Sequence, residues 1–311
     1  MRGIIIENSG PLTTIQDKGR NGFRRYGVPA SGAMDTFSMQ AANILAGNPP
    51  GAPLLEATLT GPEIRFISAC KVAVTGAPCE VTLNGSPVSQ WRSIRAGRNA
   101  VLKTGTATAG ARIYIAFSGG LAVSPAMGSS STYLKGSFGG IKGRELRKGD
   151  IIPLEKSGSF LPGRRALPAS LIPICTDEVT LDILPGIHFS LLGNSWKEFM
   201  TSRIFTVSPY IDRMGLRLLP DSATPGKTSG NTISCPIHYG AIQIPGDGNP
   251  VIMGADAQTI GGYPQFSNII TSDLDKVGQL RPGNRIRFNI VSYEIAVEKI
   301  LQQVIRLESL K

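Results

Sequence analysis

The chain has 311 residues, enough for two ordinary domains or one large β fold, and 41% of them are hydrophobic. Charged residues make up only 17%, which argues against disorder, and no apolar run approaches the roughly 20 residues of a transmembrane helix. The N-terminal stretch MRGIIIENSGPL is too polar for the core of a signal peptide. We therefore expect a cytoplasmic protein that is not in a membrane.

The charge is unevenly distributed along the chain. Residues 1–165 carry 20 Lys/Arg and 9 Asp/Glu, a net charge of +11, whereas residues 166–311 carry 12 and 13, a net charge of −1. This difference predicts a basic N-terminal β domain over 1–165 and a C-terminal β domain with a terminal helix over 166–311, joined by the Pro/Gly/Ser-rich residues 157–170. The basic half suits an anionic substrate or an acidic partner. The basic residues are dispersed and aromatics are few, so we expect no nucleic-acid binding.

Most segments are predicted to be short strands that end at turn residues. Asn84-Gly85 is the strongest hairpin signal, because both residues tolerate the positive φ of a type I′ turn. The sequence PGDGNP predicts a second hairpin between Ile244 and Val251. The expected strands are 4–6, 63–66, 71–75, 80–83, 100–103, 112–117, 179–184, 203–208, 241–244, 251–253 and 285–290.

Two helices are predicted with their ends. Asp35 can cap the first, which runs through Ala46 and closes at Gly47. The second covers 292–307, with Val297, Ile300, Leu301, Val304 and Leu307 on one apolar face. A third, shorter helix is expected at 195–200. Strands without regular intervening helices exclude a parallel α/β sheet and leave a mainly β barrel or sandwich.

Several common site types are excluded by inspection. Pro225-Gly226-Lys227-Thr228 ends like a phosphate-binding loop, but the first glycine of that pattern is replaced by Asp221. His188 and His238 have no partner at ligand spacing, so we expect no metal site. No lysine lies in a biotin-attachment context, so no covalently bound cofactor is expected. The four cysteines, which lack C-x-x-C spacing, are predicted to be buried small hydrophobes in a reducing cytoplasm: Cys70, Cys79, Cys175 and Cys235.

Two polar clusters lie near the N-terminus. Gln16, Asp17, Lys18 and Arg20 crowd donors and acceptors around Gly19, which lets a backbone approach a ligand closely. The alternative is a charged turn. Ser31 and Gly32 precede the cap at Asp35, where free N–H groups of the helix can bind an anion. The alternative there is a plain capped helix.

A third cluster covers residues 119–150, with the hydroxyl run SSST at 129–132 and the glycine-rich GGIKGRELRKGD at 139–150. It offers hydroxyls, flexible glycines and Arg144 to a ligand. A glycine-rich loop at the rim of a barrel is the alternative, and such loops often carry function.

The fourth cluster is DAQTIGGYP at 256–264, with the companion DRMG at 212–215. If the segment is extended, Asp256 and Gln258 face the same side and present a general base and an amide to one substrate group. The alternative is a hydrogen-bonded β-turn.

These clusters, in this order, resemble the KipA family, also called allophanate hydrolase subunit 2 or biotin-dependent carboxyltransferase-like. The stretches that carry the resemblance span residues 10–288: GPLTTIQDKGRNGF, GVPASGAMDTFSMQAANILAGN, LLEATLTGPEIRF, GSSST…GGIKGREL, VSPYIDRMGLRL, GAIQIPGDGNPVIMGADAQTIGGYP and LRPGNRIRF. The resemblance implies a mainly β fold of two cyclophilin-like β-barrel halves with few helices.

The resemblance also implies a function. Family members include the C-type subunit of prokaryotic 5-oxoprolinase, which uses ATP to hydrolyse 5-oxo-L-proline to glutamate with a LamB-like A-type subunit and a KipI-like B-type subunit. Others belong to the carboxyltransferase domain of urea carboxylase, where a partner carries biotin, and some were described as partners of a kinase inhibitor. We expect the first of these, a subunit that is inactive alone. The family pattern has a basic residue after the aspartate of DAQTIGGYP, whereas this chain has Ala257, so the substrate can differ.

A planar lactam or urea needs donors at its carbonyl oxygen and an acceptor at its N–H. We predict Arg20, Arg213 and Gln258 as donors, Asp256 or Asp17 as acceptor or base, and Tyr263 as a positioning group. The other residues expected to bind substrate are Gln16, Ser31, Asp35, Arg144, Asp212, Gln243, Thr259 and Gly262.

Overall fold

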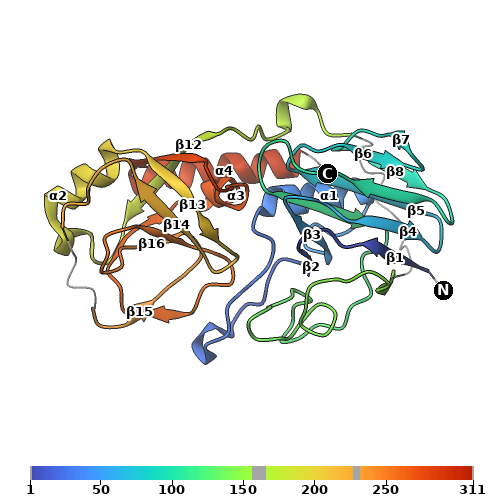
Figure 1. The fold of residues 1–311 in the computed structure, drawn as a ribbon, viewed down its shortest axis with the longest axis horizontal. Helices are drawn as coiled ribbons and strands as arrows, with labels where there is room; N and C mark the ends of the chain where they lie inside the picture. The colour runs from blue at the N-terminus through green and yellow to red at the C-terminus, as the bar shows by residue number, and fades with distance from the viewer. Residues whose placement is uncertain (1, 156–165, 227–231, 310–311) are drawn as a thin grey trace. The chain divides into compact units, whose positions relative to one another are not determined.

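The computed structural model describes residues 2–155, 166–226 and 232–309, and it divides into two compact units (Figure 1). Unit 1 comprises Met1–Arg20, Ser31–Cys175 and Ile305–Lys311, and unit 2 comprises Asn21–Ala30 and Thr176–Val304. The chain thus passes from unit 1 to unit 2 after Cys175, ten residues beyond the boundary predicted after residue 165. In addition, a short segment of each half of the chain belongs to the other unit.

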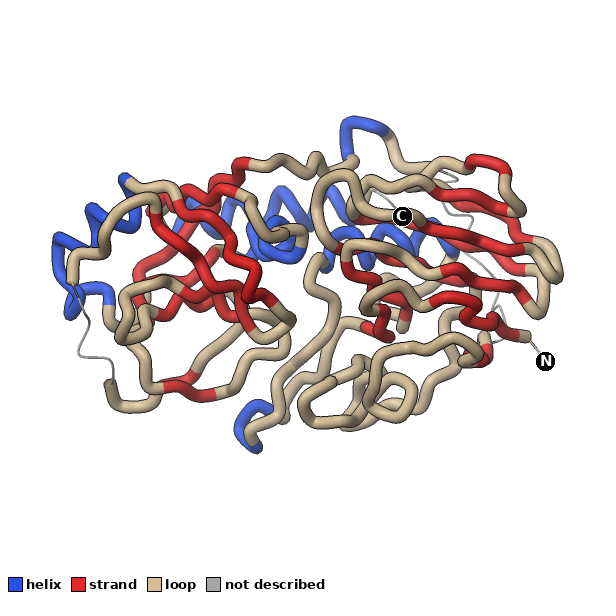
Figure 2. The backbone as a smooth tube through the Cα atoms, in the orientation of Figure 1, coloured by secondary structure: helices blue, strands red, loops and turns tan. Residues whose placement is uncertain are grey.

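Unit 1 holds its strands in two sheets, drawn red in Figure 2. The six-stranded sheet has the order β11-β1-β4-β9-β6-β7, formed by Ile151–Pro153, Gly3–Asn8, Glu63–Phe66, Val101–Thr104, Val81–Leu83 and Ser86–Pro87. The five-stranded sheet has the order β2-β3-β10-β5-β8, formed by Thr13–Gln16, Leu54–Thr58, Arg112–Phe117, Cys70–Gly76 and Ser93–Ala96. Apolar side chains of both sheets form one continuous core.

Strand β10 is covered on both of its faces. Alternate side chains of a strand point to opposite faces, and all six residues of β10 are buried. Ile113, Ile115 and Phe117 enter the core between the sheets. Tyr114 and Ala116 face the other way, into a cluster with the helix α1 (Thr36–Ala46). The five-stranded sheet is therefore covered on both faces.

Helix α1 begins and ends as predicted. The Asp35 side chain accepts a hydrogen bond from the Ser38 N–H, and Gly47 closes the helix with φ of 83°. Its outer side packs against Trp91, Leu167 and Leu307. Leu167 lies in the segment 157–170 that was predicted as a linker. Residues 157–165 of this segment lie outside the described residues, whereas the residues that follow belong to unit 1 and lead into the short helix η2 (Ala169–Leu171).

Unit 2 is a closed barrel of seven strands in the order β12-β19-β16-β17-β14-β13-β20. The strands are Glu178–Pro185, Gln265–Ile269, Ala241–Gln243, Val251–Met253, Gly215–Pro220, Phe205–Ile211 and Arg285–Ile290. The pair β12–β20 is parallel, and the other pairs of the barrel are antiparallel. A separate two-stranded sheet pairs β15 (Cys235–Pro236) with β18 (Ile260–Gly261).

Three α-helices accompany the barrel: α2 (Phe189–Ser202), α3 (Leu274–Gly278, after the 3-10 turn η3, Thr271–Asp273) and α4 (Tyr293–Glu308). Another 3-10 turn, η1 (Arg24–Tyr26), lies in the segment that unit 2 takes from the N-terminal half. Helix α4 is held by polar contacts, since Lys299 pairs with the buried Asp182 of β12 and the Gln303 amide donates to Asp275 of α3.

The prediction of a mainly β protein with few helices is confirmed, and the second half is a closed barrel. Both predicted hairpins form: β6 and β7 meet across Asn84-Gly85, which have φ of 52° and 79°, and β16 pairs with β17. Within the described residues, no helix is long and apolar enough to cross a membrane.

The helix expected at 195–200 forms as part of the longer α2, and Gly193, with φ of 78° and ψ of −177°, kinks it. Several apolar residues predicted on one face of α4 are exposed, with Val297, Leu301 and Val304 between 36% and 56% accessible. Helical periodicity shows that a stripe exists but not which side of the helix meets the protein.

Candidate functional site

In unit 1, the Asp17 carboxylate is the centre of a clasp that joins two distant parts of the chain. It accepts hydrogen bonds from the Gly19 N–H at 2.8 Å and, at 2.6 Å each, from the Ser129 hydroxyl, the Ser131 hydroxyl and the Ser130 N–H. Asp17 is 6% exposed. The hydroxyl run at 129–132 therefore binds this carboxylate. These contacts explain why a buried aspartate is stable at position 17 without invoking a role as base.

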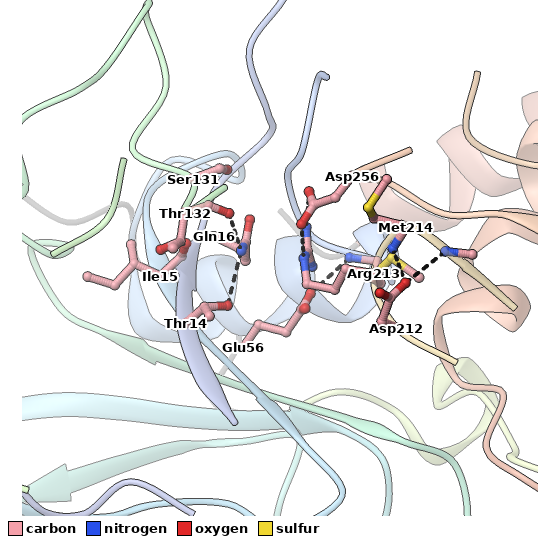
Figure 3. A network of polar contacts seen from close by, with 12 residues as sticks. Thr14, Ile15, Gln16, Glu56, Ser131, Thr132, Asp212, Arg213, Met214 and Asp256 are labelled. Carbon is pink, nitrogen blue, oxygen red and sulfur yellow. Dashed lines mark hydrogen bonds and ion pairs between the residues drawn. The ribbon is translucent and has the colours of Figure 1, made fainter. Parts of the chain in front are cut away.

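Gln16 and Arg20 extend the same clasp, and both are buried. The Gln16 amide donates to the Thr14 hydroxyl at 3.0 Å and to the Thr132 carbonyl at 3.2 Å (Figure 3). The Arg20 guanidinium donates to the Ser131 carbonyl and lies 4.8 Å from the centre of the Phe138 ring. The structure thus brings Gln16, Asp17 and Arg20 together with the 129–132 run, which lies more than a hundred residues away in sequence.

The glycines of GGIKG are required by close packing against the clasp. A Cβ at Gly139 would lie 2.0 Å from the Ser131 carbonyl oxygen, and one at Gly140 would lie 2.0 Å from the Thr132 hydroxyl. Both residues have positive φ. These glycines therefore let the loop close over the residues that hold Asp17 and Arg20.

Arg144, predicted to bind substrate, forms a bidentate ion pair with Asp150 at 2.8 Å for each contact. The hydrogen bonds from Arg144 hold the pKa of Asp150 below its ordinary value, and the same bonds raise the pKa of Arg144. The pair fixes the end of the glycine-rich loop, and a role in substrate binding stays a prediction.

A second buried network in unit 1 lies under the start of α1. The Glu56 carboxylate accepts from the Met34 N–H and from the Tyr114 hydroxyl, at 2.9 Å each, and the Tyr114 hydroxyl accepts from the Asp35 N–H at 2.8 Å. Burial, with the nearby charges of Glu56 and Asp35, raises the pKa of Tyr114 well above its ordinary value. Sequence analysis missed Glu56 and Tyr114; the only signal was a single carboxylate inside the apolar strand LLEAT.

Ser31 lies just before this network with a left-handed backbone, φ of 53°. Its hydroxyl is buried and has no hydrogen-bond partner among the described residues. Asp35 uses both carboxylate oxygens on Ser38, through its N–H and its hydroxyl. Asp35 therefore acts as a helix cap, as the simpler of the two sequence interpretations predicted.

In unit 2, Arg213 and Asp256 form a buried bidentate ion pair (Figure 3). The Arg213 Nε donates to one carboxylate oxygen at 2.8 Å and an Nη donates to the other at 3.1 Å, and each side chain is 4% exposed. The Asp256 N–H also donates to the Arg213 carbonyl at 2.9 Å. DRMG and DAQTIGGYP are thus joined by backbone and side chain, as their pairing in the sequence analysis anticipated.

The arrangement expected within DAQTIGGYP is wrong in one respect. Ala255 and Asp256 form a turn, closed by the Ala257 N–H on the Gly254 carbonyl, so the segment is not extended at this point. Asp256 is consequently buried while Gln258 is exposed, and the two do not face one substrate group together. Ala257 is 2% exposed in an apolar cluster with Ile237 and Met253.

The remaining predicted residues of unit 2 surround this turn. The Gln243 amide is buried and donates to the Tyr263 carbonyl at 3.2 Å, and the Thr259 carbonyl accepts from the Ile237 N–H. The Gly262 carbonyl accepts from Thr232, and the Tyr263 side chain is 43% exposed. Asp212 is exposed and caps its own turn through the Met214 and Gly215 N–H groups. No group of three or more His, Cys, Asp or Glu suited to a metal occurs in the described part of the chain.

Comparison with known proteins places the chain in a family. A model described as the carboxyltransferase domain, subdomain A and B, matches residues 26–290. The chain belongs to this carboxyltransferase-domain family. The resemblance noted in the sequence is thereby confirmed.

Relatives within the family differ in length. The C-type subunit of the Haemophilus influenzae 5-oxoprolinase is 34% identical over 300 residues, which cover 96% of this chain and 94% of that protein. The urea amidolyase of Lachancea kluyveri is 35% identical over 327 residues, which cover 98% of this chain but 18% of that enzyme. The crystal structure of the K. lactis urea amidolyase matches with a TM-score of 0.92 and 31% identity, over 99% of this chain and 20% of that one. The chain therefore spans about a fifth of the urea amidolyases and nearly all of the bacterial subunit.

Proposed function

We propose that this carboxyltransferase-domain protein is a subunit of an ATP-dependent 5-oxoprolinase complex, which adds water across the lactam C–N bond of 5-oxo-L-proline to give L-glutamate. The observation that carries the proposal is the 34% identity over 94% of the C-type subunit of the H. influenzae 5-oxoprolinase. The chain acts with an A-type and a B-type partner subunit and is inactive alone.

Each unit, taken by itself, offers one buried arginine as a donor for this substrate. 5-Oxoproline presents a carboxylate and a lactam oxygen, and both are acceptors that a guanidinium recognises well. Arg213 is oriented by two hydrogen bonds to Asp256, and Arg20 is oriented by the Ser131 carbonyl and the Phe138 ring. A fixed donor costs little reorganisation when charge develops on the lactam oxygen.

The same geometry changes the role proposed for Asp256. A carboxylate with both oxygens on one guanidinium is occupied as an acceptor, so Asp256 positions Arg213 rather than acting as the general base. Gln258 and Tyr263, which are exposed on the same segment, stay as further groups that contact substrate.

The second candidate function is carboxyl transfer in a urea carboxylase or allophanate system, with biotin on a partner. The TM-score of 0.92 to the K. lactis urea amidolyase favours it. The two functions differ in substrate and in partner, so one assay can separate them.

The assay reconstitutes the chain with the A-type and B-type subunits of its own genome and measures ATP hydrolysis and glutamate with 5-oxoproline or urea. We expect glutamate and ADP only with 5-oxoproline and all three subunits. ATP hydrolysis with urea and a biotin carboxylase partner, without glutamate from 5-oxoproline, would establish the second function instead.

The site is tested in the same assembly with Asp256→Asn. We expect turnover to fall at least tenfold while the assembly persists, because the amide cannot hold the guanidinium with two acceptor oxygens. The matched control is Asp177→Asn, which changes an aspartate whose side chain is 85% exposed. Equal turnover in both variants would show that the Arg213–Asp256 pair is not part of the site.

A further inference from the structure

Helix α4 turns Lys299 and Gln303 toward the rest of unit 2 and leaves several apolar side chains exposed. Within unit 2, the Lys299 ammonium pairs with Asp182, and the Asn289 amide donates to the same carboxylate at 2.8 Å. One turn further on, the Gln303 amide donates to Asp275 of helix α3. These contacts from successive turns fix which side of α4 faces the rest of unit 2.

The opposite side of α4 carries an exposed apolar stripe, which we define as Tyr293, Val297, Leu301, Val304 and Ile305. The spacing i, i+4, i+8, i+11 and i+12 places these residues on one side of a helix. Tyr293 is 70% exposed, Leu301 56% and Ile305 67%. A contiguous apolar stripe of three turns is unlike the single exposed apolar residues of an ordinary surface and marks an interaction site.

The charges beside the stripe are all acidic. Glu294, Glu298 and Glu308 are exposed, and at 100° per residue they fall within or beside the stripe. The two cations of α4 within the described residues make other contacts: Lys299 pairs with Asp182, and the Arg306 guanidinium lies 4.3 Å from the centre of the Phe37 ring. This acidic edge contrasts with the net charge of +10 for the whole chain.

The acidic edge argues against a second copy of the chain as the occupant. In an antiparallel pair of α4 helices centred on Leu301, Glu294 of each copy would face Glu308 of the other. In a parallel pair, each glutamate would face its own counterpart. Like charges across a helix pair are unfavourable in both directions.

We propose that the α4 stripe is the docking surface for a partner subunit, which contributes an amphipathic helix whose apolar face is bordered by lysine or arginine. Such a helix would bury the stripe and pair its cations with the three glutamates. The identity of that partner as an A-type or B-type subunit rests on the proposed function.

The test compares two leucines of unit 2. Leu301→Glu places a charge in the stripe, and Leu191→Glu is the matched control, because Leu191 on α2 is 72% exposed and lies outside the stripe. Sedimentation velocity first measures each chain alone and then with the A-type and B-type subunits. We expect Leu301→Glu to weaken assembly at least thirtyfold, and Leu191→Glu to change it less than threefold. Circular dichroism should be the same for both variants.

A charge reversal adds a second readout. Glu298→Lys should slow association about threefold or more at 50 mM salt and have little effect at 500 mM, because the attraction between exposed charges is screened. Assembly that Leu301→Glu leaves intact would overturn the inference, as would a dimer of the chain alone that Leu301→Glu dissociates. An assembly that depends on Leu301 but gives no glutamate from 5-oxoproline would instead count against the proposed function.

Discussion

Two buried aspartates of the predicted clusters, Asp17 in unit 1 and Asp256 in unit 2, are stabilised in different ways. Asp17 in unit 1 is held by four neutral donors, two hydroxyls and two backbone N–H groups. Asp256 in unit 2 is held by a single guanidinium through two bonds. Neutral donors spread the stabilisation over several residues, whereas an ion pair concentrates it in one partner. Removing one hydrogen-bonding partner of the aspartate should therefore lower the free energy of unfolding far more in unit 2 than in unit 1.

The largest effect is expected from breaking the ion pair. Asp256→Ala removes two charge-assisted hydrogen bonds from a buried guanidinium, and we expect it to lower the free energy of unfolding of unit 2 by about 3–5 kcal/mol. Urea denaturation followed by the fluorescence of Trp196, on helix α2 of unit 2, measures this loss. A double-mutant cycle with Arg213→Gln should show a coupling of at least about 1 kcal/mol. Additive effects of the two changes would contradict a direct pair.

A smaller loss is expected when the charge in unit 1 is removed. Asp17→Asn keeps the shape but loses charge-assisted bonds, and we expect a cost of about 2–3 kcal/mol. Ser129→Ala removes only one of the four donors and should cost about 1 kcal/mol. Limited proteolysis within residues 119–150 provides the readout. A serine variant as damaging as Asp17→Asn would show that stabilisation is not shared among the donors.

The glycines test whether close packing fixes the clasp. Gly139→Ala should destabilise unit 1 by about 3 kcal/mol, because it adds a clash with the Ser131 carbonyl to the strain of positive φ. Gly149→Ala is the control, since Gly149 also has positive φ but a Cβ there meets open space among the described residues. It should cost only about 1 kcal/mol. Thermal unfolding compares the two variants. An equal loss of stability in both would show that close packing against the Ser131 carbonyl does not contribute.

The smallest effect is expected from the half-buried pair Arg144–Asp150. The folded-state pKa of Asp150 is depressed, so the pair contributes stability above the ordinary aspartate value of about 3.9 and loses it as the pH falls further. The contribution should stay below about 1 kcal/mol because solvent screens the pair. Asp150→Asn should flatten this part of the acid-unfolding curve, and an unchanged curve would show that the pair adds nothing.

Local signals predicted local structure well. Asp35 and Gly47 fixed the ends of α1, and Asn84-Gly85 fixed a hairpin, because capping and turn chemistry act over a few residues. Strands β2 and β3 were missed, since their polar residues Gln16 and Glu56 interrupt the apolar pattern while being buried by contacts made elsewhere. A pattern in sequence does not show such tertiary partners.

The sequence singled out residues of both buried networks, but it could not show their contacts. The resemblance identified Asp17 and Asp256, and the sequence could not show that distant serines of the clasp, or Arg213, would occupy their oxygens. Glu56 was missed because one carboxylate in an apolar strand carries no motif. Each of these facts depends on long-range contacts, which have no local signature.

The C-terminal residues of α4 complete a cluster that begins near residue 37. Leu307 packs against the group of Phe37, Ile44 and Trp91, and Arg306 donates to the Leu171 carbonyl. These residues follow the strands of the barrel in sequence, so a ribosome makes them only after the strands of unit 2. Unit 1 therefore lacks this part of its apolar cluster until the whole barrel has been synthesised, although its sheets are made earlier.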